Sequence, residues 1–241
     1  MTHLQEQLDH LKKALSDMAT LVESQLHKSI DALLEQDEDL ANEVLHRERR
    51  VNAFELKIDK DCENIFALLT PVAHDMRLVF ATLKINADLE RIGDYAEGIS
   101  KIVVDGKKGY DKKLVQTLEL KNMFEIVFAM LKDVIVAYTE NDSRLARSVF
   151  SRDLLVNDIN HNALQIVVQY CKENNEGIPH AINLLSIIRK LERVGDHVTN
   201  IAEEIIFFKE AQVLKHGNKG GDSTADHMSG TIRNTPGDTH A

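Results

Sequence analysis

One charged peptide occurs once in each half of this chain. DLERIGD covers Asp88 to Asp94, and KLERVGD covers Lys190 to Asp196. A longer match precedes each copy, EVLHRERRVNAFE from Glu43 and SVFSRDLLVNDIN from Ser148. Self-similarity on this scale indicates that both halves adopt the same unit of structure. The repeat therefore constrains the architecture more strongly than any single motif does.

The remaining sequence favours helices. Apolar residues recur at heptad-like spacing, prolines number only three, and no useful run of strand-like alternation occurs. Six long helices are predicted, over about 3–35, 37–69, 72–104, 112–140, 142–174 and 179–211. The predicted fold is all-α, with two tandem similar three-helix bundles at 1–106 and 107–212. Residues 213–241 are rich in Gly, Ser, Thr and Asp, so we expect a disordered tail there.

Bulk properties exclude several classes of protein. The formal net charge is -10 and no long Lys/Arg stripe is visible, so a nucleic-acid partner is not expected. No run of 18 apolar residues exists, which argues against a membrane span. The N-terminal segment lacks the apolar centre of a signal peptide. Cys62 and Cys171 lack metal-site spacing, so we expect a reduced, cytoplasmic protein.

Each half carries two polar pairs with a spacing of four residues. The pairs are Glu48/Asn52 and Glu90/Asp94 in the first half, and Asp153/Asn157 and Glu192/Asp196 in the second. Residues four apart share one helix face. If the two helices form an antiparallel hairpin with its turn at 69–72, counting residues outward from the turn places Asn52 opposite Glu90 and Glu48 opposite Asp94. The second half gives nearly the same register.

Helical phase predicts where these side chains point. Glu90 and Asp94 sit roughly 170° from the centre of the apolar stripe of their helix, and the Glu48/Asn52 face flanks its own stripe by about 90°. The second half repeats both relationships. We therefore expect all eight residues to lie outside the core, in an outward-facing seam between two helices, once per half.

Such a seam has the chemistry of a hard-cation site. Three carboxylates and one amide at one level repel one another unless a cation neutralises them. Oxygen ligands suit Mg²⁺, Mn²⁺, Ca²⁺ or iron better than structural zinc or copper. Gly93 and Gly195 cost about 1 kcal/mol each inside a helix, which suggests close approach of a neighbouring backbone or an ion. A solvated charged face, or a duplication without function, remains the alternative.

These segments resemble the PhoU family of bacteria and archaea over residues 5–210. PVAHDMRLVFATLKINADLERIGDYAEGI, LERVGDHVTNIAEEI and the two acid-xx-Val-Asn segments carry the resemblance. It implies two three-helix bundles whose E(D)xxxD motifs bind multinuclear metal clusters, with iron and zinc associated with the fold. Glu90, Asp94, Glu192 and Asp196 match the motif, and Glu48 and Asp153 match its first position. Asn52 and Asn157 depart from the motif, because each stands where the motif has an acid. The identity of the metal therefore stays open among iron, manganese, magnesium and zinc.

The resemblance also implies a role. The expected protein is not an enzyme but a negative regulator of the phosphate-starvation response, acting on phosphate uptake and signalling. It would link the ATPase subunit of a phosphate ABC transporter to a sensor histidine kinase. Glu55 and Asp59 continue the acidic face in the first half, where the second has Asn160 and Leu164, so the first site is expected to hold more metal.

Two other functions stay open at the level of sequence. One is a metal-free helical adaptor whose acidic seam docks a basic partner. The other is a carboxylate-bridged di-iron enzyme, which the sequence disfavours because that class uses Glu-x-x-His facing the core, whereas Gly93 and Gly195 stand at the histidine position. Apolar surface on the first and fourth predicted helices also leaves room for a homodimer.

Overall fold

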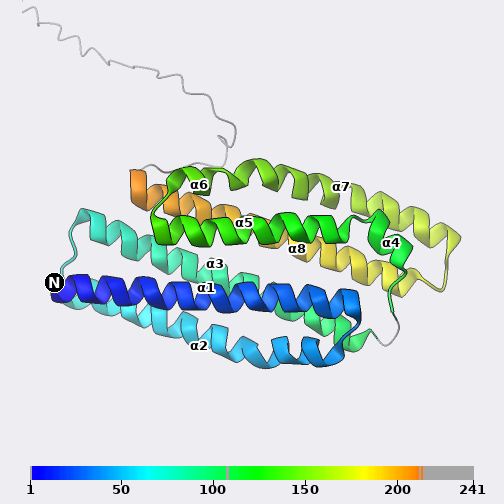
Figure 1. Cartoon of the computed structure of the whole chain (residues 1–241), viewed down its shortest axis with the longest axis horizontal. Helices are drawn as coiled ribbons and strands as arrows, with labels where there is room; N and C mark the ends of the chain where they lie inside the picture. Colours follow the sequence, from blue (N-terminus) through cyan, green and yellow to red (C-terminus); the bar gives the residue numbers. More distant parts are fainter. Residues whose placement is uncertain (1, 107–108, 212, 214–241) are drawn as a thin grey trace, which may run out of the picture.

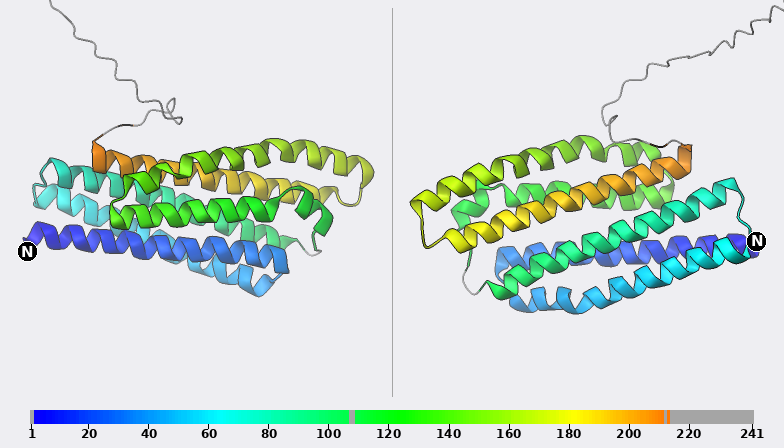
Figure 2. Two further views of the ribbon diagram at one scale, coloured as in Figure 1. Left: turned by 45° about the horizontal axis from the view of Figure 1, so that its top comes forward. Right: turned by 180° about the vertical axis from the view of Figure 1, so that it is seen from behind.

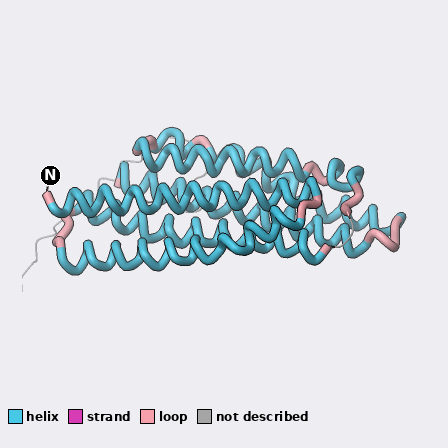
Figure 3. The backbone as a smooth tube through the Cα atoms, turned by 60° about the horizontal axis from the view of Figure 1, so that its bottom comes forward, coloured by secondary structure: helices cyan, strands magenta, loops and turns pink. Residues whose placement is uncertain are grey.

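Long amphipathic helices make up nearly all of the part of the chain that the structure describes. The computed structural model describes residues 2–106, 109–211 and 213, and this part contains helices and no strand (Figure 3). Its helices are α1 (His3–Glu35), α2 (Glu38–Leu68), α3 (Ala73–Asp105), α4 (Lys112–Thr117), α5 (Leu120–Glu140), α6 (Ser143–Arg147), α7 (Val149–Glu173) and α8 (Ile178–Glu210). The predicted tail, residues 213–241, lies outside the described residues apart from Val213.

Side-chain caps fix where several helices begin. The Asp37 carboxylate accepts a hydrogen bond from the backbone N–H of Leu40 at 2.9 Å and opens α2. Asp111 and Asp142 cap α4 and α6 in the same way. Pro179 lies in the first turn of α8, where its missing N–H is not needed. The turns of the hairpins therefore fall close to the predicted positions.

The fold is the predicted pair of three-helix bundles. Helices α1, α2 and α3 form the first bundle, and α4–α5, α6–α7 and α8 form the second (Figure 1). All six predicted helical stretches are present, but in the second half the fourth and the fifth are each broken once into two helices. The fourth breaks between α4 and α5, and the fifth breaks at Ser148.

The first break lets two leucines share the core. Leu118 and Leu120 would point about 200° apart on a continuous helix, yet both are buried. Glu119 between them adopts a left-handed backbone with φ 51°, which turns the chain and directs both leucines inward. At Ser148 the hydroxyl donates to the Leu145 carbonyl at 2.7 Å. Such a local side-chain bond competes with the regular helix pattern.

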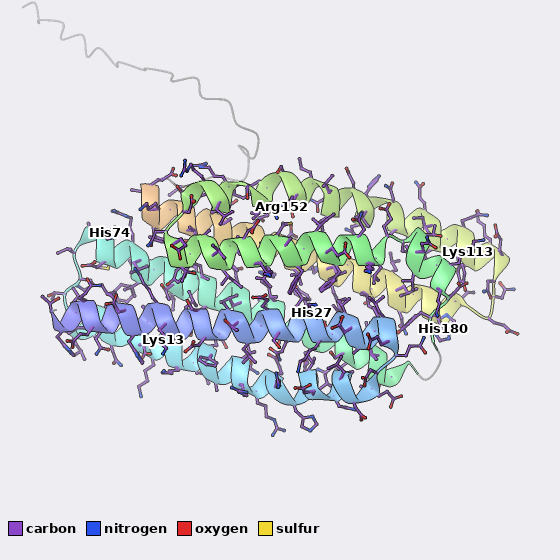
Figure 4. All side chains as sticks on the ribbon, viewed as in Figure 1. Lys13, His27, His74, Lys113, Arg152 and His180 are labelled. Atoms are coloured by element: carbon purple, nitrogen blue, oxygen red, sulfur yellow. The ribbon has the colours of Figure 1, made fainter. Side chains whose placement is uncertain are left out.

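The two bundles dock through equivalent helices. Helix α3 runs antiparallel beside α8, and α1 runs antiparallel beside α5, which relates the two repeats by an approximate two-fold axis (Figures 1 and 2). His27 lies where α1 meets α5 and packs edge-on against Phe128, with ring centroids 5.1 Å apart (Figure 4). Buried apolar side chains of both bundles belong to a single core.

Polar contacts also cross between the bundles. The Thr82 and Tyr138 hydroxyls are hydrogen-bonded at 3.0 Å in the buried interface. His197 Nδ1 lies 2.7 Å from Asp88 Oδ1, and the two residues are mostly covered. Within the ranges that the structure describes, no helix combines the length and apolar character needed to cross a membrane.

Candidate functional site

Each glycine of the repeated motif lies against a carboxylate of the facing helix. A Cβ atom placed on Gly93 of α3 would lie 3.4 Å from Oε2 of Glu48 and 3.2 Å from Cγ1 of Val51, both on α2. A Cβ atom on Gly195 of α8 would lie 3.2 Å from Oδ1 of Asp153 on α7. Both hairpins therefore have the same register, and Glu48 faces the turn of helix that carries the Glu90/Asp94 motif. The absence of a glycine side chain allows this approach.

We call the two sets of motif residues the first seam and the second seam. The first seam consists of Glu48 and Asn52 on α2 with Glu90 and Asp94 on α3. The second seam consists of Asp153 and Asn157 on α7 with Glu192 and Asp196 on α8.

The prediction that all eight residues lie outside the core was wrong for Glu48 and Asp153. They are only 5% and 3% exposed. Their predicted angle of about 90° from the apolar stripe is the boundary between core and surface. The facing helix, brought close at Gly93 or Gly195, covers that boundary. Glu90 is also largely covered, with a side chain 16% exposed, while Asp94 is 40% exposed.

Glu48 is a buried carboxyl that accepts a hydrogen bond from α1, the helix of its bundle that carries no motif residue. Gln25 of α1 donates from Nε2 to Glu48 Oε2 at 3.2 Å. The other oxygen, Oε1, is buried and has no hydrogen-bond partner among the described residues. Burial raises the pKa of Glu48 to about 7, and the negative charge of Asp94 adds to the rise. Glu48 is thus an acceptor that lacks a full set of donors or a compensating positive charge.

The rest of the first seam is acidic and partly neutralised by Arg91. The Arg91 guanidinium lies 3.2 Å from Asp94 Oδ2 and 3.6 Å from Glu90 Oε2. Burial nevertheless raises the pKa of Glu90, and the charges of Asp94 and Glu55 raise it further. Asn52 is exposed at the edge of the seam.

The second seam is assembled differently. The Asn157 amide donates to Asp153 Oδ2 at 3.0 Å, so the asparagine supports the buried carboxylate from its own helix. Burial raises the pKa of Glu192, followed by the charge of Asp196, while Arg193 lowers it. Asp196 is exposed. The two seams share a backbone register but differ in side-chain contacts.

The donor chemistry of the first seam fits a hard cation. All its candidate ligands are oxygens, their charges repel one another, and the unpaired Glu48 oxygen is directed at the α3 motif. As the side chains stand, however, no three His, Cys, Asp or Glu residues of the described chain converge in a way that could hold a metal ion. Side-chain rotation about fixed helices is therefore needed for binding.

Several polar residues near the seams were not anticipated from the sequence. Gln25 reaches Glu48 from α1, and the Asn86 amide on α3 donates to Asp59 Oδ1 at 2.8 Å. Asn200 joins the Asp88–His197 contact between the bundles, donating to Asp88 Oδ1 at 3.3 Å. A polar residue on an apolar helical stripe was the available signal for Gln25 and Asn86.

Comparisons with known proteins agree with this architecture. The family model described as PhoU domain matches residues 15–103 and 120–205, one match per bundle. The phosphate-specific transport system accessory protein PhoU of Escherichia coli strain K12 is 32% identical over 224 residues, covering 93% of this chain and 91% of that protein. The PhoU homolog of Zymomonas mobilis is 31% identical over 224 residues, covering 93% of this chain and 94% of that protein.

Solved structures give the same result. The crystal structure of PhoU from Pseudomonas aeruginosa superposes with a TM-score of 0.83 at 31% identity, covering 87% of this chain and all of that one. The phosphate transport system regulatory protein PhoU from Streptococcus pneumoniae gives a TM-score of 0.79 at 25% identity, covering 88% of this chain and all of that one.

Proposed function

Because this chain belongs to the PhoU family, we propose that it is a cation-binding accessory and regulatory protein of phosphate transport. The names of its relatives, an accessory protein of a phosphate-specific transport system and a phosphate transport regulatory protein, support the transport role. The observation that supports cation binding most directly is the state of Glu48. It is a buried carboxyl with one unpaired oxygen, and it faces other carboxylates. No catalytic activity is part of the proposal.

The cation would be held by the oxygens of the first seam, and by those of the second seam in the other bundle. Its chemistry there is charge neutralisation, which lets neighbouring carboxylates stay ionised at close range. Gln25 fixes the Glu48 carboxyl from α1, and Gly93 lets α2 approach α3. Arg91 holds the Glu90 and Asp94 carboxylates until they turn toward Glu48. Iron, manganese, magnesium and zinc are the candidate metals.

The regulatory part of the proposal concerns partners. In it, the protein acts in the cytoplasm as a negative regulator of the phosphate-starvation response, between the ATPase subunit of a phosphate ABC transporter and a sensor histidine kinase. Two rigid bundles joined by one core would present both partners with fixed helix surfaces. The supporting evidence is family membership and the relatives' names.

Elemental analysis of the purified full chain tests cation binding. The wild-type protein should retain metal after gel filtration, and Glu90→Ala/Asp94→Ala should lose at least the part bound by the first seam. Glu6→Ala/Asp9→Ala is the matched control, because it removes two exposed acids of α1 far from both motifs in sequence. Unchanged metal content in the Glu90/Asp94 variant rejects this site.

Loss of the gene tests the regulatory role. In the organism that encodes this chain, its deletion should switch on phosphate-starvation genes in phosphate-rich medium, and the wild-type gene should restore repression. Genes that stay repressed after deletion would contradict negative regulation, whatever the metal content of the protein.

A metal-free adaptor is the second candidate function. It is favoured by the pairing of Arg91 with Glu90 and Asp94 and by the lack of a converging acidic trio in the described chain. In that case the seams would dock basic groups of a partner directly. Binding to the transporter ATPase subunit or the kinase that is equal with and without a chelator supports the adaptor, whereas chelator-sensitive binding supports the cation-dependent regulator.

A further inference from the structure

The outer face of the α7–α8 hairpin carries exposed apolar side chains close to its turn. Leu164 and Val168 lie four residues apart on α7, so they share one helix face, and they are 50% and 47% exposed. Ile182 on α8 is 56% exposed. The two helices lie side by side (Figure 2), and counting along the hairpin from Gly195, which faces Val156, places Val168 about level with Ile182. We call Leu164, Val168 and Ile182 the apolar patch.

The charge around the apolar patch differs from that of the rest of the chain. Residues 159–172 and 177–191 contain no Asp or Glu, although the chain has 39 of them among 241 residues. These two segments carry Lys172, Arg189 and Lys190. The acids that border them lie at the turn between α7 and α8 and beside the second seam. The apolar patch therefore has a positively charged setting in a protein whose formal net charge is -10.

The first half has acids where the second half has the apolar patch. The repeat aligns Asp59 with Leu164 and Glu63 with Val168. The parts of the first half that match 159–172 and 177–191 contain six acids, Glu55, Asp59, Asp61, Glu63, Asp75 and Asp88. Because the α2–α3 hairpin folds with acids at these positions, the repeated fold does not require the apolar patch. An exposed apolar patch that folding does not require indicates an interaction surface.

Two exposed arginines of α8 continue the apolar patch toward the second seam. Ile182, Arg189 and Arg193 fall within about 40° of one another around the helix, along a stripe about 16 Å long. Neither arginine makes an ion pair with a residue of the described chain, whereas Arg91, the counterpart of Arg193, pairs with Asp94. The guanidinium groups of this stripe are therefore available to the carboxylates of a partner.

We infer that the apolar patch, together with Arg189 and Arg193, is the docking surface for an acidic amphipathic helix of a protein partner. The apolar face of that helix would cover Leu164, Val168 and Ile182. Carboxylates beside its apolar face would form charge-assisted hydrogen bonds with the two arginines. The inference rests on the proposed action through protein partners and adds the surface and the chemistry of one partner. It does not depend on a bound cation.

A partner helix fits this surface better than a membrane does. Segments that bind anionic lipids gather about four to eight Lys or Arg residues. Between residues 159 and 193 the exposed Lys and Arg residues are Lys172, Arg189 and Arg193. The exposed Asp196 lies close to them on α8, and a lipid surface of negative charge would be repelled by it and by the net charge of the chain. A single helix can place its carboxylates against the arginines alone.

Selection from a peptide library tests the inference on the full chain, with chelator present. The library contains helical peptides of about 18 residues, or roughly five turns, with leucine on one face and Glu, Gln or Lys at each position beside that face. Leu164→Asp/Val168→Glu gives the apolar patch the residue types of the first half. Leu56→Asp/Lys57→Ala is the matched control, because it removes an exposed leucine and an exposed lysine from α2. Circular dichroism checks that each variant is folded.

Peptides selected on the wild-type protein should carry Glu rather than Lys beside the leucine face. For a selected peptide labelled with fluorescein, fluorescence anisotropy should give a Kd that Leu164→Asp/Val168→Glu raises by about tenfold or more. Arg189→Ala/Arg193→Ala should raise it several-fold, and the control Leu56→Asp/Lys57→Ala should leave it unchanged. Binding should weaken as salt is added, because the paired charges are near the surface.

Several results would overturn the inference. Selected peptides without a preference for Glu over Lys, or with equal affinity for Leu164→Asp/Val168→Glu and the wild type, would show that this surface does not bind an acidic helix. A wild-type dimer in sedimentation velocity that becomes a monomer in this variant would assign the patch to a second copy of the chain. Cosedimentation of the wild type, but not of the variant, with phosphatidylglycerol vesicles would assign it to a membrane.

The proposed function fails or stands separately from this inference. Loss of peptide selectivity leaves the regulatory role in place, because gene deletion tests that role without reference to any one surface. Phosphate-starvation genes that stay repressed after deletion would contradict the regulatory role even if the acidic peptide binds the apolar patch.

Discussion

Gly195 and Asp153 face each other across the α7–α8 hairpin so closely that a Cβ atom added to the glycine would lie only 3.2 Å from Oδ1 of the carboxylate. Gly93 and Glu48 repeat this relationship across α2 and α3 at 3.4 Å. In each hairpin a valine of the earlier helix, Val51 or Val156, lies against the same glycine. The glycine of the repeated peptide is therefore a packing requirement that brings a buried carboxyl to the motif of the facing helix.

We expect the size of the side chain at Gly195 to control the stability of the second hairpin. Gly195→Ala should change the free energy of unfolding little, because a gain of about 1 kcal/mol in helix propensity is offset by the tight contact. Gly195→Val should destabilise the protein by about 1–3 kcal/mol, because two further carbons must displace Asp153 and Val156. Urea unfolding followed by circular dichroism measures both.

Gly98 provides the matched control. A Cβ atom there would meet the flexible end of Lys190, at 3.0 Å from Nζ, and this side chain can move aside. Gly98→Ala should therefore stabilise the protein by up to about 1 kcal/mol. Gly195→Val as stable as the wild type would show that the α7–α8 contact is looser than the structure indicates.

The raised pKa of Glu48 predicts a pH-dependent stability. The folded protein keeps the Glu48 proton up to about pH 7, whereas the unfolded chain loses it near the ordinary value of 4.5. Between these pH values the folded state binds more protons, so the free energy of unfolding falls as the pH rises. With chelator present, Glu48→Gln should be more stable than the wild type at pH 8, by about 1–2 kcal/mol, and nearly equal to it at pH 4.5.

Glu43→Gln is the control with the opposite sign. The pKa of Glu43 is lowered by a hydrogen bond from Lys28 and by the charges of Lys28 and Arg47. Its ionised form therefore contributes stability above the ordinary pKa, and this contribution is lost as the pH falls through the lowered value. Glu43→Gln should be slightly less stable than the wild type at pH 8. A Glu48→Gln protein with the wild-type pH profile would contradict the assignment.

The contact between Asp88 and His197 should couple the two bundles. A double-mutant cycle of Asp88→Ala and His197→Ala should give an interaction free energy of about 0.5–2 kcal/mol, because the pair is mostly covered and 2.7 Å apart. The pair Lys84–Glu204 spans the same α3–α8 interface, but the Lys84 side chain is 61% exposed. Its cycle should give under about 1 kcal/mol. Equal interaction free energies in the two cycles would show that the Asp88–His197 pair couples the bundles no more strongly than the exposed Lys84–Glu204 pair.

The buried hydrogen bond between Thr82 and Tyr138 should show the cost of an unsatisfied hydroxyl. Tyr138→Phe should destabilise the protein by about 1–3 kcal/mol, because Thr82 is left buried without its partner. Thr82→Val/Tyr138→Phe removes both hydroxyls and should recover part of that loss. A double variant that is no more stable than Tyr138→Phe alone would contradict this account.

The sequence predicted the residues that meet because a repeat and a helical period carry that information. The two copies of LERxGD, the turn near Pro71 and the four-residue spacings were enough to set α2 against α3 in the observed register. The glycine inside each charged peptide suggested close approach of a neighbouring backbone or an ion, whereas the atoms nearest to it are side-chain atoms of the facing helix. These features depend only on each helix and the hairpin that joins it to the next one.

Burial could not be predicted in the same way. Helical phase gives the angle of Glu48 on α2, but its 5% exposure depends on how closely α3 approaches at Gly93 and on Gln25 of α1. The left-handed Glu119 likewise arises because Leu118 and Leu120 must both reach a core shared with other helices.

The sequence by itself thus determined an all-α repeat, the hairpin register and the eight oxygen-bearing residues of the two seams. Only the tertiary structure decided that Glu48 and Asp153 are buried, that Asn86 reaches Asp59, and that α3 packs on α8. The physical reason is that exposure and hydrogen bonding depend on neighbours from distant parts of the chain, whereas helical periodicity reports only the orientation of a side chain on its own helix.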